Sequence, residues 1–279
     1  MTTHKLDLNV SGVVDLRTGA ININALDAID VRGATSVRVQ SQRADVDVST
    51  SLGLSVGQLL SATAGEVTVS SLSTLDVSAP TSTLLTTGEL EIAVAKDVVA
   101  SARDVVVDLT GAITGNVADK VELSMLDLTL SATQTAEVTV GGAADVAVGG
   151  DALFVVSERA DVVIGSELRI TTEEFGLYAD DTIDLASTNM TLRANHSMEL
   201  TVTKELTVRG ENLTLEAESS FDVTAADYMT LTTNAMTINA RELKLEALRF
   251  LDIQVMEDIF LATDRTRLRM SSGGPSPPL

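Results

Sequence analysis

The chain has 279 residues, a formal net charge of −21, no cysteine, and only 3% aromatic residues. Without cysteine it can contain neither a disulfide nor a site built on a thiolate. The negative charge and the scarcity of rings argue against nucleic-acid binding, because phosphates would be repelled and bases would find little to stack on.

A repeat governs the sequence. Between residues 188 and 239 the apolar pair Met190/Leu192 returns as Leu213/Leu215 and then as Met236/Ile238, each time after 23 positions, with two further pairs in each interval. Alternation of apolar and polar residues predicts short strands, and three strands per cycle are typical of a solenoid. The sequence therefore predicts an all-β fold, a three-sided parallel β-solenoid (β-helix) of about twelve coils of 23 residues.

The repeat begins near the N-terminus, at Leu6/Leu8, and runs to Ile259/Leu261. We expect a single solenoid domain over residues 1–270, followed by a Gly/Pro/Ser-rich tail over 271–279 that is extended or disordered. Residues 96–109 and 241–261 also fit a helical period. We assign both to strands, because their apolar pairs keep the steps of the repeat.

One coil departs from the pattern. The charged residues Glu167 and Arg169 occupy the positions where the repeat predicts an apolar pair, and the apolar pair comes one residue later as Leu168/Ile170. This predicts a bulge or a changed corner. The acidic pairs Glu173/Glu174 and Asp180/Asp181 follow shortly after, and adjacent carboxylates could form a calcium site or a catalytic acid pair. In so acidic a chain a solvated corner is the favoured interpretation.

Positive charge is concentrated near the C-terminus, where Arg265, Arg267 and Arg269 alternate with other residues. Two interpretations remain open. The arginines could protect an edge strand from pairing with other chains, or they could form a docking end for an acidic partner or a further subunit.

Catalysis has no obvious place in this sequence. β-Helical enzymes form their clefts from long loops inserted at the corners, whereas here the repeat leaves room for insertions of only a residue or two. His4 and His196 are too far apart in the repeat to form a paired metal site. We therefore expect no enzyme activity, no cofactor and no metal. We also expect neither a signal peptide nor a transmembrane segment, which indicates a cytoplasmic protein or part of a virion or large assembly without stable membrane anchoring.

The Val-Gly-rich stretch over 138–170, with its eight-residue steps, resembles the β-helical needle of phage central spikes and of the valine-glycine repeat proteins of type VI secretion systems. In that family three chains wind around one another into a triangular prism. The resemblance implies, as an alternative fold, an intertwined homotrimer that acts as a membrane-piercing needle. The strict 23-residue period favours one chain that closes its own coils, because the sides of an intertwined trimer are equivalent by symmetry.

The sequence thus predicts a non-enzymatic structural protein, a rigid rod that serves as a spike, filament or scaffold subunit. Its expected partners are proteins, through end-to-end self-association or a homotrimer. A polysaccharide-acting β-helix enzyme, with Asp180 and Asp181 in its site, is the remote alternative. Bactofilin-type filaments, which polymerise end to end, offer an analogy of architecture only.

Overall fold

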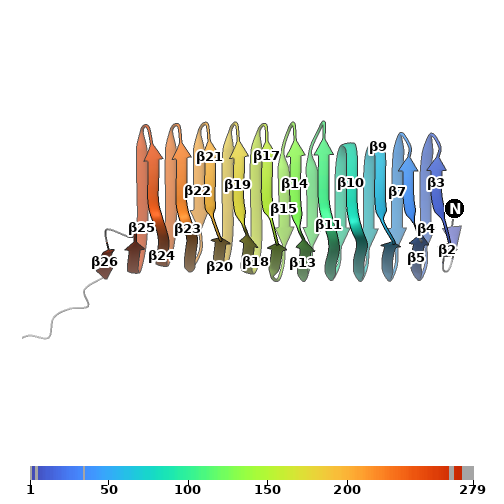
Figure 1. Ribbon diagram of the computed structural model, residues 1–279, viewed down its shortest axis with the longest axis horizontal. Helices are drawn as coiled ribbons and strands as arrows, with labels where there is room; N and C mark the ends of the chain where they lie inside the picture. The colour runs from blue at the N-terminus through green and yellow to red at the C-terminus, as the bar shows by residue number, and fades with distance from the viewer. Residues whose placement is uncertain (1, 4–5, 34, 264–266, 272–279) are drawn as a thin grey trace, which may run out of the picture.

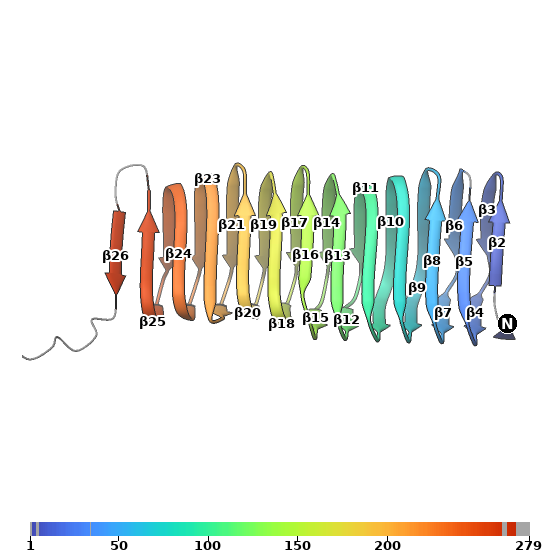
Figure 2. The same cartoon turned by 90° about the horizontal axis from the view of Figure 1, so that it is seen from below.

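The computed structural model describes residues 2–3, 6–33, 35–263 and 267–271. Over these residues the chain forms an all-β rod that winds through about 11 turns with a spacing of ~23 residues (Figure 1). The N-terminus lies at one end of the rod and the last strand at the other, as the two views in Figures 1 and 2 agree.

In chain order the strands are β1 (Thr2–Thr3), β2 (Leu6–Val10), β3 (Val13–Arg17), β4 (Ala20–Ala25), β5 (Ala28–Gly33), β6 (Ser36–Gln40), β7 (Arg43–Val48), β8 (Ser51–Val56), β9 (Leu59–Ser71), β10 (Thr74–Val94), β11 (Asp97–Leu109), β12 (Ile113–Val117), β13 (Lys120–Met125), β14 (Asp127–Ala132), β15 (Ala136–Val140), β16 (Ala144–Val148), β17 (Asp151–Val156), β18 (Arg159–Thr172), β19 (Glu174–Ala179), β20 (Thr182–Ala194), β21 (Ser197–Val202), β22 (Glu205–Arg209), β23 (Asn212–Ala225), β24 (Tyr228–Ala247), β25 (Phe250–Ala262) and β26 (Arg267–Ser271). The longer strands continue around one or two corners without a break.

Three columns of parallel strands form the sides of the rod. The first side begins with β2, the second with β3 and the third with the short β1, which pairs with β4, and each strand pairs with the strand one turn later. Leu6 pairs with Ile29 on the first side, and Val14 pairs with Val37 on the second. Since these partners belong to one chain, each turn closes on itself. The single-chain solenoid predicted from the 23-residue period is confirmed, and the described strands do not form the intertwined prism.

Inward side chains of the three sides meet in a narrow core of Leu, Val, Ile, Met and Ala. Leu206, Met229 and Ile238 have no exposed surface, and Phe221 is 1% exposed. Strands alternate their side chains between the two faces, so every second residue enters this core. The regions over 96–109 and 241–261, which also fit a helix, are strands β11, β24 and β25.

At one corner three successive turns carry glycine, because their backbones approach closely there. Gly65, Gly88 and Gly111 occupy equivalent positions between the second and third sides. A Cβ atom on Gly88 would lie 2.3 Å from the carbonyl oxygen of Gly65, and one on Gly111 would lie 2.4 Å from that of Gly88. No side chain fits at such distances.

The predicted slip is confirmed, but its origin lies earlier in the chain than Glu167. Met125 still pairs with Val148, 23 residues on, whereas Leu128 pairs with Ala152, 24 residues on. The extra residue therefore enters at the corner Gly149-Gly150. It displaces the following strands, so that Ala144 pairs with Leu168. The column returns to the original count at Met190, which pairs with Leu168 after only 22 residues.

The end of the rod differs from the prediction of twelve regular coils. After about 11 turns the chain adds only the first strand of another turn, the final part of β25. The chain then reverses, and β26 pairs with Asp258–Ala262 in antiparallel orientation. Parallel coils therefore stop here. On the second and third sides, the last strands leave their outer edges uncovered by any described strand.

Candidate functional site

The residues of the slipped coil do not form one cluster. Glu167 and Arg169 stand on the first side, where an Arg169 nitrogen lies 2.6 Å from Glu167 and another lies 3.6 Å from Asp145 of the preceding turn. Asp180 and Asp181 lie after β19, at the corner between the second and third sides. The structure thus separates the two pairs that the sequence placed near one another.

Asp180 and Asp181 act in the ladder between turns. The carboxylate of Asp181 forms an ion pair with Lys204, one turn later, and this hydrogen bond raises the pKa of the lysine. The carbonyl oxygen of Asp180 accepts a hydrogen bond from the hydroxyl of Thr203. Among the described residues no group of three or more His, Asp or Glu side chains could hold a metal ion. The Asp181 carboxylate therefore pairs with a lysine, whereas Asp180 contributes its backbone carbonyl, an arrangement typical of a solvated corner.

At the corner between the first and second sides, Glu173, which the sequence had marked only as part of an acidic pair, lies in a cluster that the sequence did not predict. Glu173 accepts a hydrogen bond of 2.9 Å from the Asn195 side chain, and its other oxygen lies 3.0 Å from Nδ1 of His196. Hydrogen bonding to Asn195, and then to His196, lowers the pKa of Glu173. All three side chains are solvent-exposed or nearly so. The 23-residue spacing of Glu173 and His196 could have revealed their contact.

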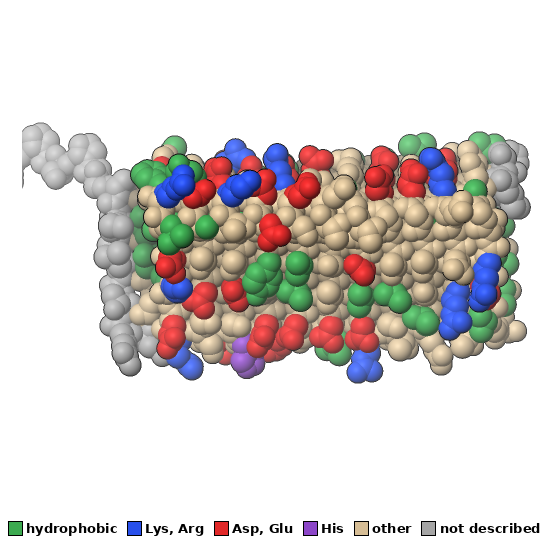
Figure 3. Space-filling model, turned by 90° about the horizontal axis from the view of Figure 1, so that it is seen from above, with side chains coloured by type: hydrophobic (Ala, Val, Ile, Leu, Met, Phe, Trp, Pro, Cys, Tyr) green, Lys and Arg blue, Asp and Glu red, His purple; other side chains and the backbone are tan. Residues whose placement is uncertain are grey.

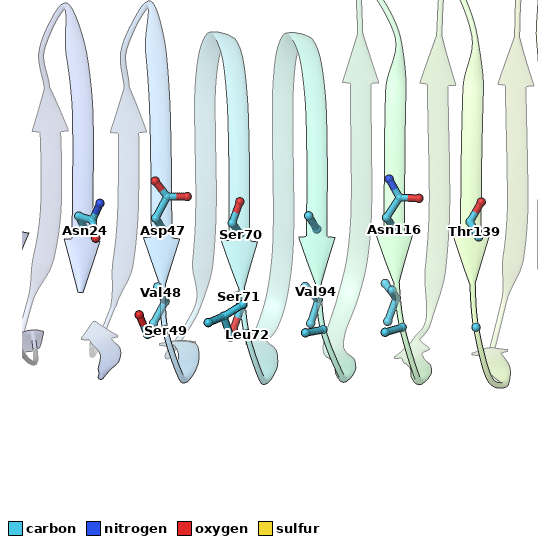
Figure 4. A pocket seen from close by; sticks show the side chains of 15 residues that line it. Asn24, Asp47, Val48, Ser49, Ser70, Ser71, Leu72, Val94, Asn116 and Thr139 are labelled. Atoms are coloured by element: carbon cyan, nitrogen blue, oxygen red, sulfur yellow. The ribbon is translucent and has the colours of Figure 1, made fainter. Parts of the chain in front are cut away.

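An open groove of about 670 Å³ runs along the corner between the third and first sides. Figure 4 shows a row of side chains above it, one from each of several successive turns, in which Asn24, Asp47 and Ser70 are followed later by Asn116 and Thr139. The row contains amides, hydroxyls and a single carboxylate. Such a surface can donate and accept hydrogen bonds, but it has no pair of groups suited to acid–base chemistry.

Exposed apolar side chains gather on the second side. Hydrophobic side chains lie about midway along one face of the rod in Figure 3. On the second side Leu84, Val106, Leu153 and Val155 are between 37% and 40% exposed, although their positions point away from the core. On the outward strand positions of the first side, by contrast, only Val99 and Phe260 reach such exposure among the large apolar residues described.

The aromatic ring of Tyr178 extends this apolar surface. A Cβ atom on Gly176 would lie 2.8 Å from the ring and 3.2 Å from a methyl group of Leu153, so both side chains lean over the glycine. The hydroxyl of Tyr178 donates a hydrogen bond of 2.8 Å to Glu199. Burial, and then this hydrogen bond, raises the pKa of Tyr178 to about 12. Reading the outward positions of the second strand turn by turn could have shown the surface, but the apolar pairs of the core dominate the pattern.

The C-terminal end of the rod exposes part of the core. Leu251, at the inward position that the fully buried Met229 holds one turn earlier, is 41% exposed. Leu248 and Met256 at the corners, each 73% exposed, and Phe250 at an outward position, 55% exposed, add apolar surface at the same end. Two of the predicted docking arginines, Arg267 and Arg269, lie in strand β26 at this same end of the rod. Arg265 lies outside the described residues. The end thus combines open strand edges with uncovered apolar side chains.

No helix in the described part of the chain is long and apolar enough to cross a membrane. Comparison with protein-family models, with curated protein sequences and with solved structures gives no match for this chain.

Proposed function

We propose that the chain is a non-enzymatic structural rod, a spike, filament or scaffold subunit of a larger assembly. The observation that carries this proposal is the continuity of the three strand columns through about 11 turns. Paired residues in neighbouring parallel strands are 22 to 24 residues apart in the sequence, so the length of a turn varies by no more than one residue from 23. A chain built in this way specifies a length and a stiffness, because every turn adds one strand spacing of about 4.8 Å.

The uncovered C-terminal end supports a place in an assembly. Strand edges that lack a partner and apolar side chains that lack a cover both favour contact with another protein. The open edges of the second and third sides, together with Leu248, Phe250 and Met256, form the surface that we assign to docking. On the first side the outermost strand is the antiparallel β26, so the incoming protein would meet edges of opposite strand direction.

Deletion of one complete turn tests the rod directly. Removing residues 190–212 joins Asn189 to Leu213, which takes the place of Met190 because the two residues are partners in the ladder. We expect this variant to fold cooperatively and to be shorter by about 4.8 Å. The matched control removes residues 190–204, which places a strand of the third side on the first side and should unfold the rod from that point. If both deletions unfolded the protein alike, the modular rod would be wrong.

A concentration series in small-angle scattering tests the docking end. Lengthwise contact between copies would raise the maximum dimension at constant cross-section, and Met256→Lys should suppress that increase. Val163→Lys, at an outward position on the third side, serves as the control, since Val163 is itself 42% exposed. A particle of constant length at every concentration would contradict lengthwise self-association and would assign the end to a different protein.

A further inference from the structure

The outward positions of the second side form three straight rows along the rod. The row nearest the preceding corner is acidic in its middle, with Asp104, Asp127, Asp151 and Glu174. The apolar residues lie in the middle row and in the row nearest the following corner, which is called the second row.

The middle row runs from Asp15 through Arg38, Ser61, Leu84, Val106 and Thr129, each residue paired with the next along the column. It continues from Thr129 through Leu153, Gly176, Glu199, Asp222 and Lys244. Thr129 occupies the middle of this row, with five outward residues on each side of it.

If a second copy of the row runs in the opposite direction and the two rows are aligned at Thr129, the residues that come to lie opposite each other have complementary side chains. One step from the middle stand Val106 and Leu153, both apolar. Two steps away stand Leu84 and Gly176, the glycine covered by the ring of Tyr178. Apolar surface therefore faces apolar surface at the centre.

Charges near the two ends of the row are also matched. Four steps from Thr129 stand Arg38 and Asp222, and five steps away stand Asp15 and Lys244, so each reversal brings opposite charges together. In the second row Arg17 and Glu246 occupy the corresponding end positions and are likewise of opposite charge. An apolar centre with charged ends is the usual anatomy of a protein interface.

We propose that two copies of this chain pack face to face through their second sides, antiparallel, about a two-fold axis at Thr129. Val106 of one copy then contacts Leu153 of the other, and Leu84 contacts the ring of Tyr178 above Gly176. Arg38 of each copy lies opposite Asp222 of the other. An interface of this kind is isologous, because the same patch serves both subunits.

The size of the face suits a stable dimer. Eleven rungs span ten strand spacings, about 48 Å, and strands of five residues are about 17 Å long. The product is roughly 800 Å² for each copy, which is the area that a standard protein interface buries per partner.

Charge decides between the antiparallel arrangement and its parallel counterpart. In a parallel face-to-face pair, Arg38 would lie near Arg38 of the other copy, and the acidic region around Glu199 and Asp222 would lie near its own duplicate. Like charges brought together repel, whereas the antiparallel pair places the basic region of each copy against the acidic region of the other.

Carboxylates fit this interface poorly. In the row nearest the preceding corner, Asp104 lies opposite Asp151 when the faces are reversed, and Asp127 lies beside its own duplicate. Asp108, in the second row, lies opposite Val155 when the faces are reversed about Thr129. Desolvating a carboxylate against an apolar side chain is unfavourable. Replacing Asp108 with Thr should therefore strengthen the dimer.

Sedimentation of the full chain tests the proposal. The expected particle has twice the chain mass of 29.3 kDa. The double variant Leu153→Lys/Val155→Lys should sediment as a monomer, whereas Val163→Lys, an equally exposed position on the third side, should remain dimeric. Circular dichroism and thermal unfolding establish that each variant is folded. A wild-type monomer, or a dimer unaffected by the double variant, would overturn the proposal.

A charge exchange fixes the orientation. Arg38→Asp and Asp222→Arg should each raise the dissociation constant by about tenfold or more, since each replaces an attraction with a repulsion. The two changes together should restore it. Arg38 and Asp222 lie eight rungs apart in one chain, about 38 Å, so the restoration must arise between chains. Failure of the combined variant to restore dimerisation would overturn the antiparallel arrangement.

The absence of cysteine allows a further check. Thr129→Cys, on the proposed axis, should form a disulfide with its own copy under mild oxidation. Thr139→Cys, which points outward from the third side in the same turn, is the control and should not. Equal cross-linking of both variants would contradict an interface on the second side.

Discussion

The carboxylate of Glu173 lies 3.0 Å from Nδ1 of His196, which stands one turn further along the rod. Asn195 donates a second hydrogen bond to the same carboxylate, and together these contacts hold its pKa below the ordinary value of 4.5. A depressed carboxylate pKa stabilises the folded state above the ordinary value, and this contribution is lost as the pH falls through the folded value.

Glu173→Gln should therefore lower the melting temperature at neutral pH. The difference from the wild type should shrink as the pH falls below about 4.5 and vanish once the pH is below the depressed pKa of the folded state. Thermal unfolding of both proteins across a pH series measures this difference in melting temperature. Glu174→Gln changes the neighbouring exposed carboxylate and is the control. A difference between Glu173→Gln and the wild type that stays constant across the pH range would show that the ionised carboxylate is not the cause.

Because successive turns approach closely at Gly88, the cost of replacing a glycine with alanine should depend strongly on the turn in which the glycine lies. Gly88→Ala would place a Cβ atom 2.3 Å from the carbonyl oxygen of Gly65, so the backbone must shift. We expect a loss of about 1–3 kcal/mol in the free energy of unfolding. Gly19→Ala is the matched control, because Gly19 occupies the same corner in the first turn and its Cβ would have no neighbour within 4 Å. Equal effects of the two changes would refute the steric explanation.

A buried hydroxyl fixes the corner that follows β18. The Thr172 side chain is 1% exposed, and its hydroxyl lies 2.8 Å from the carbonyl oxygens of both Gly150 and Glu174, to either of which its single hydrogen can be donated. Thr172→Val keeps the shape but leaves these acceptors without the hydroxyl, which should cost about 1–3 kcal/mol in denaturant unfolding. Thr172→Ser keeps the hydroxyl and should retain more of the stability. The opposite order would show that the methyl group matters more than the hydrogen bonds.

Much of this fold could be predicted from the sequence, because the apolar pairs report directly which residues face the core. Met190, Leu213 and Met236 recur at the ladder spacing, and the structure pairs them in that order. The displaced pair Leu168/Ile170 was visible for the same reason. The inserted residue at Gly149-Gly150, which causes the displacement, could not be located from the sequence, since a corner can gain a residue without any change in the polar pattern around it.

The sequence repeat also could not predict the reversal of the chain at β26. A strand that folds back antiparallel keeps the same alternation as a parallel one, so Arg267–Ser271 reads like a further coil. Buried hydroxyls such as Thr172 escaped notice because other turns place alanine or valine at inward positions near a corner. The apolar surface of the second side requires knowledge of which strands are neighbours, and it emerges only once Leu84 and Val106 are placed in one column.

The phenol of Tyr178 offers a spectroscopic report on that surface. Its pKa is raised to about 12 by burial and by the hydrogen bond to Glu199. A raised pKa stabilises the folded state below the ordinary value of 10.0, and this contribution is lost as the pH rises toward 12. The chain has two tyrosines, so ultraviolet titration of Tyr228→Phe isolates Tyr178.

Adding Glu199→Gln to that background should lower the pKa of Tyr178, because the charged acceptor is removed while burial remains. An unchanged titration curve would assign the shift to burial alone. Titration at the unperturbed value already in the Tyr228→Phe background would contradict the packing of the ring over Gly176.

The length of the particle tests the central claim, that one chain closes its own turns, most directly. Electron microscopy of the full chain, with mass measurement on the same sample, should show a straight rod of about 53 Å for about 11 turns of one strand spacing each. A face-to-face dimer would be wider but equally long. A trimeric particle of roughly 160 Å, the length that results when every strand of an intertwined prism advances a whole spacing, would contradict the account.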